Sequence, residues 1–521
     1  MKEEIDAPVS TDASGTDLEN ARDQPSGEKP TAVDIYLVEW DGPNDPELPM
    51  NFPLWKKSLI TCIFSTLTIW VTFSSSVFSA AAGITSKEFH VSVEVMTLGT
   101  SLTVLGFTVG PLVWGPMSEL YGRLKPLYIG YAIFIIFQVP VAVAQNLETL
   151  MLARFFLGFF GTSALAIIPG ALADFWGPVE RAIAISLFSA ATFVGPIFGP
   201  IMYVNTMITL VNGVWTRANH DMSSGGFIVD SSLGWRWTAW ITMIPASFFG
   251  IIAFLTLPET YHPVLLQRRA SRLRKETRIW AYHSRLDENT PTFGEILTKY
   301  LFRPIQMLFL EPILVCMTIY ISLIYGILYL FFVAYPIAFR EVRNWKSLGI
   351  AALPFLGILV GVLMGCLLVT IATRLWYAPK LQNGSVVPED RLPPMIVAAI
   401  LLPIGLFWFG WTSSPSISWA PQAIAGAPIG MGILMIWMQG LNYLIDVYLV
   451  VANSAMSANT LIRSAVGAAF PLFATAMYHK LGVDWATSLL GFLSIAMIPI
   501  PVIFYFYGAK IRALSRFSPK W

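Results

Sequence analysis

The sequence predicts an all-α membrane protein in which twelve transmembrane helices form two six-helix bundles. Of its 521 residues, 55% are hydrophobic and only 12% are charged, whereas soluble domains carry about 25% charged residues. The apolar residues gather in runs of about 20, the length that crosses a bilayer. Lys+Arg number 33 and Asp+Glu 32, so the chain offers no broad basic surface for nucleic acid.

The chain begins with an acidic segment. Residues 1–50 contain thirteen Asp+Glu and three Lys+Arg, and such a segment buries too little apolar area to fold by itself. We expect residues 1–54 to form a disordered, acidic, cytosolic tail. We also expect the first span to direct membrane insertion, because no cleavable signal pattern precedes it.

Twelve apolar windows follow this tail and define the bundles. They lie at 58–82, 95–114, 126–144, 149–173, 183–204, 235–257, 311–337, 348–372, 394–412, 421–445, 455–478 and 484–507. The longest polar stretch separates the sixth window from the seventh. The division predicts an N-terminal bundle at 55–257, a basic cytosolic linker at 258–310, a C-terminal bundle at 311–508 and a cytosolic tail at 509–521.

The distribution of Lys and Arg predicts that both termini are cytosolic, because cationic loops resist translocation. With that orientation, the cytosolic segments at 56–57, 123–125, 181, 268–303, 374–391 and 510–520 hold twenty-one of these residues, and external segments hold seven. A multi-pass protein embedded in a lipid bilayer is the expected result.

No residue pattern predicts an enzyme, a metal site or a cofactor. The three cysteines, Cys62, Cys316 and Cys366, lie in apolar windows without a metal-binding spacing. The five histidines form no grouping with Ser, Cys or Asp that would suggest catalysis. The sequence lacks a Walker A pattern, so ATP is not expected to drive its activity.

The loop between the second and third windows is a candidate conformational latch. Gly115 and Gly122 allow helix ends to approach closely, and Glu119 and Arg123 stand four residues apart, where they can pair or bridge to other helices. An ordinary charged turn would contain the same residues. The pattern by itself leaves both interpretations open.

The fifth window carries a stripe of small residues. Gly195 and Gly199 recur at a spacing of four, which suits close helix packing, while Pro196 and Pro200 interrupt the helical hydrogen bonds and bend the helix. A packing groove is the simpler interpretation. A bent and closely packed helix is also what a domain pivot requires.

Apart from Arg236 at the very start of the sixth window, two arginines lie within apolar windows. A charge near mid-bilayer costs at least ~2.5–3.5 kcal/mol, so each is expected to face protein or water. We expect Arg154, in the fourth window, to belong to the substrate or proton pathway. We predict no role for Arg463, which lies near enough to the interface to extend its head group into water.

Aromatic and hydrogen-bonding side chains in the central windows are candidates for a substrate cavity, because such side chains bind amphipathic or aromatic compounds. A position in the core or facing lipid is the alternative for each. The candidates are Phe73, Ser74, Ser75, Phe188, Tyr325, Tyr329, Trp437, Gln439 and Asn442.

Three acidic residues stand at the ends of windows and are predicted to be gates. Asp174 and Asp446 close the fourth and tenth windows, and each is followed twenty-one residues later by a glycine, as expected for two repeated halves. Glu311 opens the seventh window. A proton-linked role is the alternative, but all three lie near the expected cytosolic surface, which favours gates. No acidic residue lies clearly at mid-bilayer in the first or fourth window, so the residue that carries a proton stays unidentified.

These motifs resemble those of the major facilitator superfamily. Residues 115–125 resemble its loop 2–3 signature, with Glu119 in the position of an aspartate and Leu120 where many members have arginine. Residues 154–158 resemble its fourth-span signature, and 195–200 the fifth-span signature of antiporters. With further matches at 233–238, 257–261, 457–460 and 470–473, the chain resembles the fungal branch of twelve-span drug/proton antiporters, which includes polyamine, azole and secondary-metabolite exporters.

The resemblance implies proton-coupled efflux of a small organic compound, a xenobiotic or a secondary metabolite, by alternating access. It implies a monomer in the plasma membrane, with the vacuolar membrane as the alternative. An uptake symporter and a non-transporting receptor remain alternative functions, although the antiporter-like fifth span argues against uptake.

Residues 202–224 depart from the family pattern, in which Gly199-Pro200-Ile201 is soon followed by Gly-Gly-Phe. Met202-Tyr203-Val204 can be encoded with a donor-like GTACGT, and Ala218-Asn219-His220 with a branch-point-like CTAAC. We therefore predict a retained intron. A real external loop is the competing interpretation, and the transcript sequence decides between them.

Overall fold

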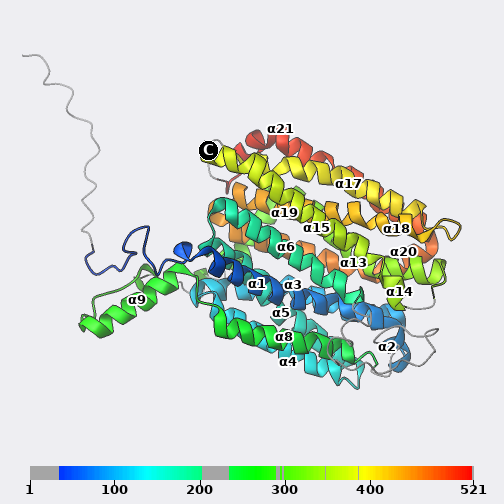
Figure 1. The fold of residues 1–521 in the computed structure, drawn as a ribbon, viewed down its shortest axis with the longest axis horizontal. Helices are drawn as coiled ribbons and strands as arrows, with labels where there is room; N and C mark the ends of the chain where they lie inside the picture. Colours follow the sequence, from blue (N-terminus) through cyan, green and yellow to red (C-terminus); the bar gives the residue numbers. More distant parts are fainter. Residues whose placement is uncertain are drawn as a thin grey trace, which may run out of the picture.

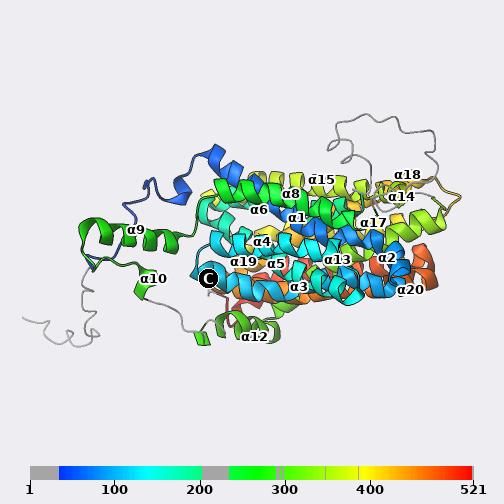
Figure 2. The same ribbon diagram turned by 90° about the horizontal axis from the view of Figure 1, so that it is seen from below.

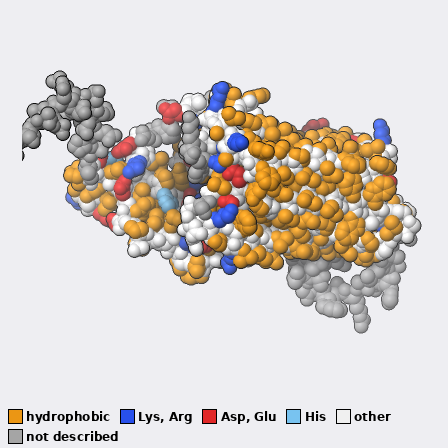
Figure 3. All heavy atoms as spheres, turned by 90° about the horizontal axis from the view of Figure 1, so that it is seen from above, with side chains coloured by type: hydrophobic (Ala, Val, Ile, Leu, Met, Phe, Trp, Pro, Cys, Tyr) orange, Lys and Arg blue, Asp and Glu red, His pale blue; other side chains and the backbone are white. Residues whose placement is uncertain are grey.

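The computed structural model describes residues 34–201, 234–288, 294–295, 298–345, 348–384 and 386–518. Within these residues the fold is helical, apart from one isolated bridge between Leu37 and His283. The helices run side by side along one direction and form an elongated body (Figure 1). Figure 3 shows one face of this body, on which hydrophobic side chains predominate and most charged side chains lie toward one end.

The first half of the body consists of six long helices and a short one. They are α1 (Leu54–Ser76), α2 (Ala82–Glu88), α3 (Val93–Leu120), α4 (Leu124–Ala142), α5 (Leu147–Phe175), α6 (Pro178–Ile201) and α8 (Trp237–Thr256). Turn η2 (Val77–Ala81) joins α1 to α2, so the first span continues to Glu88. Asn146 and Ser92 accept backbone hydrogen bonds at the starts of α5 and α3, which fixes where these helices begin.

The second half repeats this arrangement. Its long helices are α13 (Pro312–Pro336), α15 (Phe355–Ala372), α17 (Leu392–Trp411), α19 (Gly426–Val447), α20 (Ala452–Met497) and α21 (Pro499–Ala513). Shorter elements extend or join them, namely η4 (Ile337–Val342), α14 (Leu348–Ala352), η5 (Thr373–Tyr377), α16 (Ala378–Gln382), η6 (Pro388–Arg391), α18 (Trp419–Ile424) and η7 (Leu449–Val451).

Eleven helices in the described residues are long and apolar enough to cross a membrane, where the sequence predicts twelve spans. The difference lies in the last of them, Ala452–Ala513, which is 62 residues long. About 20 residues suffice for one crossing, and Gly482 breaks the helix with φ +77° and ψ 164°. This segment therefore provides both the eleventh and the twelfth predicted spans.

Close helix packing depends on small residues. A Cβ atom at Gly158 of α5 would lie 2.0 Å from the Thr103 carbonyl oxygen of α3, and one at Gly195 of α6 would lie 2.6 Å from the Ile69 carbonyl oxygen of α1. The predicted stripe of the fifth span thus packs directly against the first span. Between the two halves, α3 packs on α20 and α6 packs on α15.

The linker helices α9 (His262–Thr277) and α10 (Arg285–Glu288) lie beyond one end of the body, which we call the linker end (Figure 2). The other linker elements, η3 (Thr298–Phe302) and α12 (Arg303–Leu310), contact α3, α13 and α20 of the body. Residues 34–53, including the turn η1 (Pro49–Asn51), pack on α9 through ion pairs such as Asp45 with Arg269 (2.6 Å) and Glu47 with Arg272 (2.8 Å). The end of the predicted acidic tail is thus bound to the basic linker.

Candidate functional site

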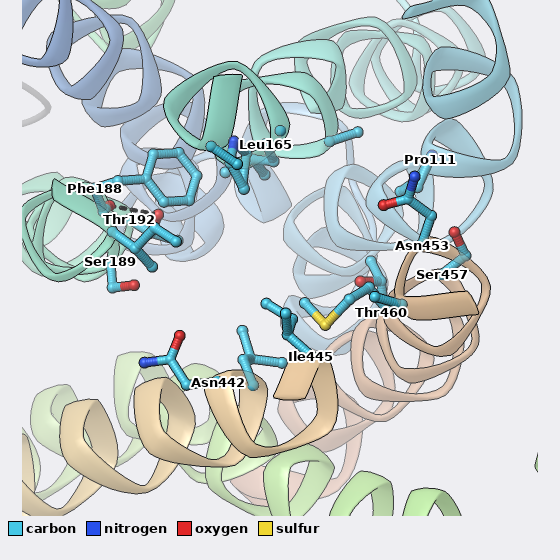
Figure 4. A pocket seen from close by; sticks show the side chains of 18 of the residues that line it. Pro111, Leu165, Phe188, Ser189, Thr192, Asn442, Ile445, Asn453, Ser457 and Thr460 are labelled. Atoms are coloured by element: carbon cyan, nitrogen blue, oxygen red, sulfur yellow. Dashed lines mark hydrogen bonds between the residues drawn. The ribbon is translucent and has the colours of Figure 1, made fainter. Parts of the chain in front are cut away.

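A cavity lies between the two halves and has a volume of about 270 Å³, close to the lower limit of about 300–1,000 Å³ that is common for small-molecule sites. Its walls come from α3, α5 and α6 of the first half and from α13, α19 and α20 of the second. Figure 4 shows side chains of both halves pointing into it, including Phe188 and Thr192 on one side and Asn442 on the other.

Four of the predicted cavity residues line this space, namely Phe188, Tyr325, Trp437 and Asn442. The Trp437 ring lies 5.4 Å from the ring of Tyr325 and 5.0 Å from that of Phe193, measured between centroids. The rings of Trp437 and Tyr325 line the cavity and form an aromatic wall, which suits a planar apolar ligand, and Phe193 packs against Trp437 outside the lining.

The structure places the other predicted cavity residues outside the lining. Phe73 and Ser74 are buried within α1, and Tyr329 hydrogen-bonds to Ser75. Gln439 lines a separate hollow between α15, η5, α17 and α19. Gln439 and Trp437 are two residues apart on one helix, hence about 200° apart around its axis, so they cannot face the same cavity.

Arg154 also lies outside the lining. Its side chain is buried, its Nε donates to the Gly99 carbonyl oxygen (3.2 Å), and its Nη1 donates to the Ser74 carbonyl oxygen (3.0 Å). The guanidinium carbon lies 4.5 Å from the Phe78 ring centroid. Arg154 therefore ties α5 to α1 and α3.

Arg463 is the cavity residue for which the sequence predicted no role. It lies eleven residues after the start of α20, about 16 Å along the helix, and it lines the cavity with only 8% of its surface exposed. Its guanidinium carbon lies 4.0 Å from the Trp437 ring centroid and 5.0 Å from that of Tyr325. The sequence offered one signal for this position, because Arg463 lies too far along α20 for its head group to reach the water at the end of the helix easily.

The predicted latch forms a network at the linker end of the first half. Arg123 Nε donates to Asp174 Oδ2 (2.9 Å), and the Glu259 carboxylate accepts from the backbone N–H groups of Arg123 (2.9 Å) and Leu124 (3.2 Å). Gly122 has φ +89°, and a Cβ there would lie 2.6 Å from Glu259 Oε2. Glycine is therefore required at this turn.

The second half contains a corresponding network. Arg391 Nε donates to Asp446 Oδ2 (2.8 Å), and its guanidinium carbon lies 3.6 Å from the Tyr377 ring centroid. Glu389, two residues earlier, pairs with Arg512 of α21 (2.9 Å). The two aspartates singled out as a repeat are thus equivalent in their contacts, and their arginine partners at positions 123 and 391 are also equivalent.

Glu119 connects the halves at the linker end. Its carboxylate accepts hydrogen bonds from Lys299 Nζ (2.9 Å) and from the Asn453 amide of α20. Gly115, Glu119, Arg123 and Asp446 all line this part of the cavity. The cavity therefore extends from the aromatic wall to the linker end.

Glu311 lies outside the cavity, where it binds the C-terminal segment. Its fully buried carboxylate accepts from Tyr448 Oη (2.9 Å), Ser515 Oγ (2.6 Å) and the Arg516 backbone N–H (2.9 Å). These bonds hold the segment after α21 against the starting turn of α13.

The halves also contact one another on the far side of the aromatic wall from the linker end. Ser75 Oγ of α1 and Tyr329 Oη of α13 are 2.9 Å apart. A Cβ atom at Gly467 of α20 would lie 3.5 Å from Val104 of α3. In this conformation the cavity therefore lies on the linker-end side of these contacts.

A helical body made of two matching halves around a cavity is typical of a secondary transporter. The family model of the Major Facilitator Superfamily matches residues 63–213 and 222–471. The chain belongs to this superfamily. It is a multi-pass membrane transporter of small molecules rather than an enzyme, and its motifs place it in the fungal branch.

Two curated fungal relatives cover nearly the full chain. The citrinin biosynthesis cluster MFS transporter mrr1 of Monascus ruber is 96% identical over 521 residues, 100% of each chain. The ascochitine biosynthesis cluster MFS transporter of Didymella fabae is 60% identical over 495 residues, 95% of this chain and 91% of its own.

A solved structure supports the fold alone. The proton:xylose symporter XylE, bound to 6-bromo-6-deoxy-D-glucose, aligns with a TM-score of 0.58 at 16% identity. The alignment covers 88% of this chain and 96% of that one.

Proposed function

We propose that this protein exports a fungal secondary metabolite from the cytosol by proton-coupled antiport. The observation that carries the proposal is the cavity between the two halves, which reaches the linker end and stops at the contacts beyond the aromatic wall. The biosynthesis clusters in the names of the relatives support a metabolite as substrate. Citrinin is the first compound to test.

Alternating access would rock one half against the other around the bound compound. The contact of Glu119 with Asn453 joins the halves at the linker end, and that of Ser75 with Tyr329 joins them beyond the aromatic wall. In our proposal these two contacts form and break in opposite states. The ion pairs of Arg123 and Arg391 keep the helix ends of each half rigid during this motion.

Proton coupling requires a carboxylate that is exposed to both sides in turn. Among the described residues that line the cavity, the acidic ones are Glu119 and Asp446. We propose that one of them carries the proton, in addition to the latch role predicted for Glu119 or the gate role predicted for Asp446.

We propose a monomer in the plasma membrane with both termini in the cytosol, the vacuolar membrane being the alternative. The linker end would then be cytosolic, since the basic helix α9 lies there. A compound made in the cytosol could enter the cavity directly in this conformation.

The test is citrinin efflux from a yeast strain that lacks its own drug pumps. We expect cells that express the protein to retain less citrinin than cells with an empty vector, and a protonophore to remove the difference. Increased accumulation would indicate an uptake symporter. Unchanged accumulation, with the protein shown at the cell surface, would leave an exporter of a different compound or a non-transporting receptor.

The predicted retained intron at 202–224 lies outside the described residues and remains a proposal. The family match is interrupted at 214–221, inside this segment, and the Monascus ruber relative aligns over the whole chain, so the same question concerns both genes. A cDNA that lacks this segment would support the intron, and one that keeps it would support the loop. The efflux test should use the cDNA-confirmed protein.

A further inference from the structure

Arg463 is a buried cation that the described part of the protein leaves without an anion. The residue is 92% buried, counted from its exposed fraction of 8%. No ion pair joins it to a described residue, and its Nε lies buried without a hydrogen-bond partner among the described residues. A guanidinium has five N–H donors, so this one can still accept a ligand.

The cavity around Arg463 keeps an excess of positive charge after its ion pairs are counted. Its lining holds four arginines, Arg123, Arg181, Arg391 and Arg463, and two carboxylates, Glu119 and Asp446. Asp174 neutralises Arg123, Asp446 neutralises Arg391, and Lys299 neutralises Glu119. Arg181 and Arg463 remain, and neither forms an ion pair within the described ranges. Such a field attracts anions into the cavity.

The neighbours of Arg463 indicate which kind of anion can bind to it. Trp437 and Tyr325 lie within 4.0 and 5.0 Å of its guanidinium carbon, so aromatic faces flank the cation. Flat rings stack on such faces, and the planar fork of a guanidinium binds a carboxylate with two parallel hydrogen bonds. Asn442 adds an amide nitrogen that has no partner among the described residues, and its side chain points into the cavity (Figure 4).

We propose that Arg463 binds the oxyanion of a planar aromatic substrate whose ring stacks against Trp437 and Tyr325. The oxyanion is a carboxylate or an ionised acidic hydroxyl on the ring, which share this chemistry. The substrate is thus recognised as an anion. The inference rests on the proposed transport function and adds the chemical class of the substrate.

The test measures the affinity of two probes of nearly equal size and shape for the full-length protein in lipid nanodiscs near neutral pH. One probe, 9-anthracenecarboxylate, is an anion, and the other, 9-anthracenecarboxamide, is uncharged. We expect the carboxylate to bind about tenfold or more tightly than the carboxamide, because a buried charge-assisted pair is formed only with the acid. Arg463→Gln should bring this ratio close to one. Equal binding, or no binding of either probe by the unaltered protein, overturns the inference.

Arg374→Gln is the matched control, because Arg374 is exposed and lies outside the lining of the cavity. It should keep the preference for the carboxylate. If Arg463→Gln does not yield folded protein, Arg463→Lys decides the question. It keeps the charge without the planar fork and should lower the ratio about threefold or more, and an unchanged ratio overturns the inference.

Citrinin efflux separates this inference from the proposed function. Efflux without a preference for the carboxylate would leave the export function intact and overturn the role of Arg463. A preference that depends on Arg463, without efflux, would support the anion site and contradict export.

Discussion

Arg154 and Arg463 lie inside membrane-spanning helices of opposite halves, and both are buried. Arg154 donates to two backbone carbonyl oxygens and lies outside the cavity, whereas Arg463 lines the cavity and rests on aromatic rings. An arginine thus holds helices together in the first half, and in the second half, as we propose, an arginine binds the substrate. What decides the role is the set of acceptors within reach of the guanidinium.

The largest expected effect is on the stability of the first half. Arg154→Gln removes the buried hydrogen bonds from the guanidinium to the Gly99 and Ser74 carbonyl oxygens, which join α5 to α3 and α1. We expect a loss of about 2–5 kcal/mol, seen as a clear fall in the melting temperature of the purified protein. Arg463→Gln removes no such bond and should leave the melting temperature nearly unchanged. Equal falls in both variants would contradict the comparison.

The second prediction concerns transport. Arg463→Gln should lower citrinin efflux about tenfold or more while the protein remains folded and at the cell surface, because the substrate loses its charged partner. The measurement is efflux per molecule of surface protein, with Arg374→Gln as the control. Normal efflux from the Arg463 variant would assign this arginine to packing, like Arg154.

The third prediction compares the two linker-end networks. Arg123→Ala leaves Asp174 without its ion pair, and Arg391→Ala does the same to Asp446. Each change should reduce efflux several-fold, since each unpaired carboxylate loosens the helix ends. The double variant Arg123→Ala/Asp174→Asn should recover part of the activity, because the coupled energy of such a pair is about 0.5–3 kcal/mol. No recovery would show that the pair of Arg123 and Asp174 does not act as a latch. Asp446→Asn is not used for this test, because Asp446 is a proposed proton carrier.

The sequence was sufficient to predict the spans, because the bilayer thickness sets their length. It was also sufficient to pair Asp174 with Asp446 as a repeat. It did not show which face of α19 lines the cavity, so Gln439 and Trp437 were predicted together although they point in different directions. Glu259 and Glu389 were missed as network members because their partners, at positions 123 and 512, are distant in sequence.

The two arginines show the same limit. A window of apolar residues indicates that a charge inside it needs compensation, but it does not indicate what compensates it. For Arg154 the acceptors are backbone carbonyl oxygens of other helices, which carry no signal in the sequence. For Arg463 the neighbours are aromatic residues 26 and 138 positions away in the chain, Trp437 and Tyr325.

The smallest expected effect lies outside the membrane, where charges are exposed to water. His283 joins residues 34–53 to the linker, because its backbone N–H donates to the Tyr36 carbonyl oxygen (3.0 Å) and its Nε2 lies near Asp34 (3.2 Å) and Glu288 (2.7 Å). The pKa of His283 is raised above its ordinary value of 6.5, first by the hydrogen bond of Nδ1 to the Ala281 carbonyl oxygen and, against the effect of burial, by these two carboxylates.

A raised pKa in the folded contact means that the contact is strongest below the ordinary value and weakens as the pH rises through the raised one. We therefore expect hydrogen exchange at the Val38 and His283 amides, which bond across this contact, to become faster as the pH rises above 6.5 and through the raised pKa of His283, after correction for the intrinsic rate. His283→Asn should remove this dependence. Hydrogen exchange at the α5 amides around Arg154 should not depend on pH after the same correction, since the backbone carbonyl oxygens that bind Arg154 do not titrate. An equal pH dependence at the His283 contact and at α5 would contradict this prediction, because it would indicate a change in the whole fold.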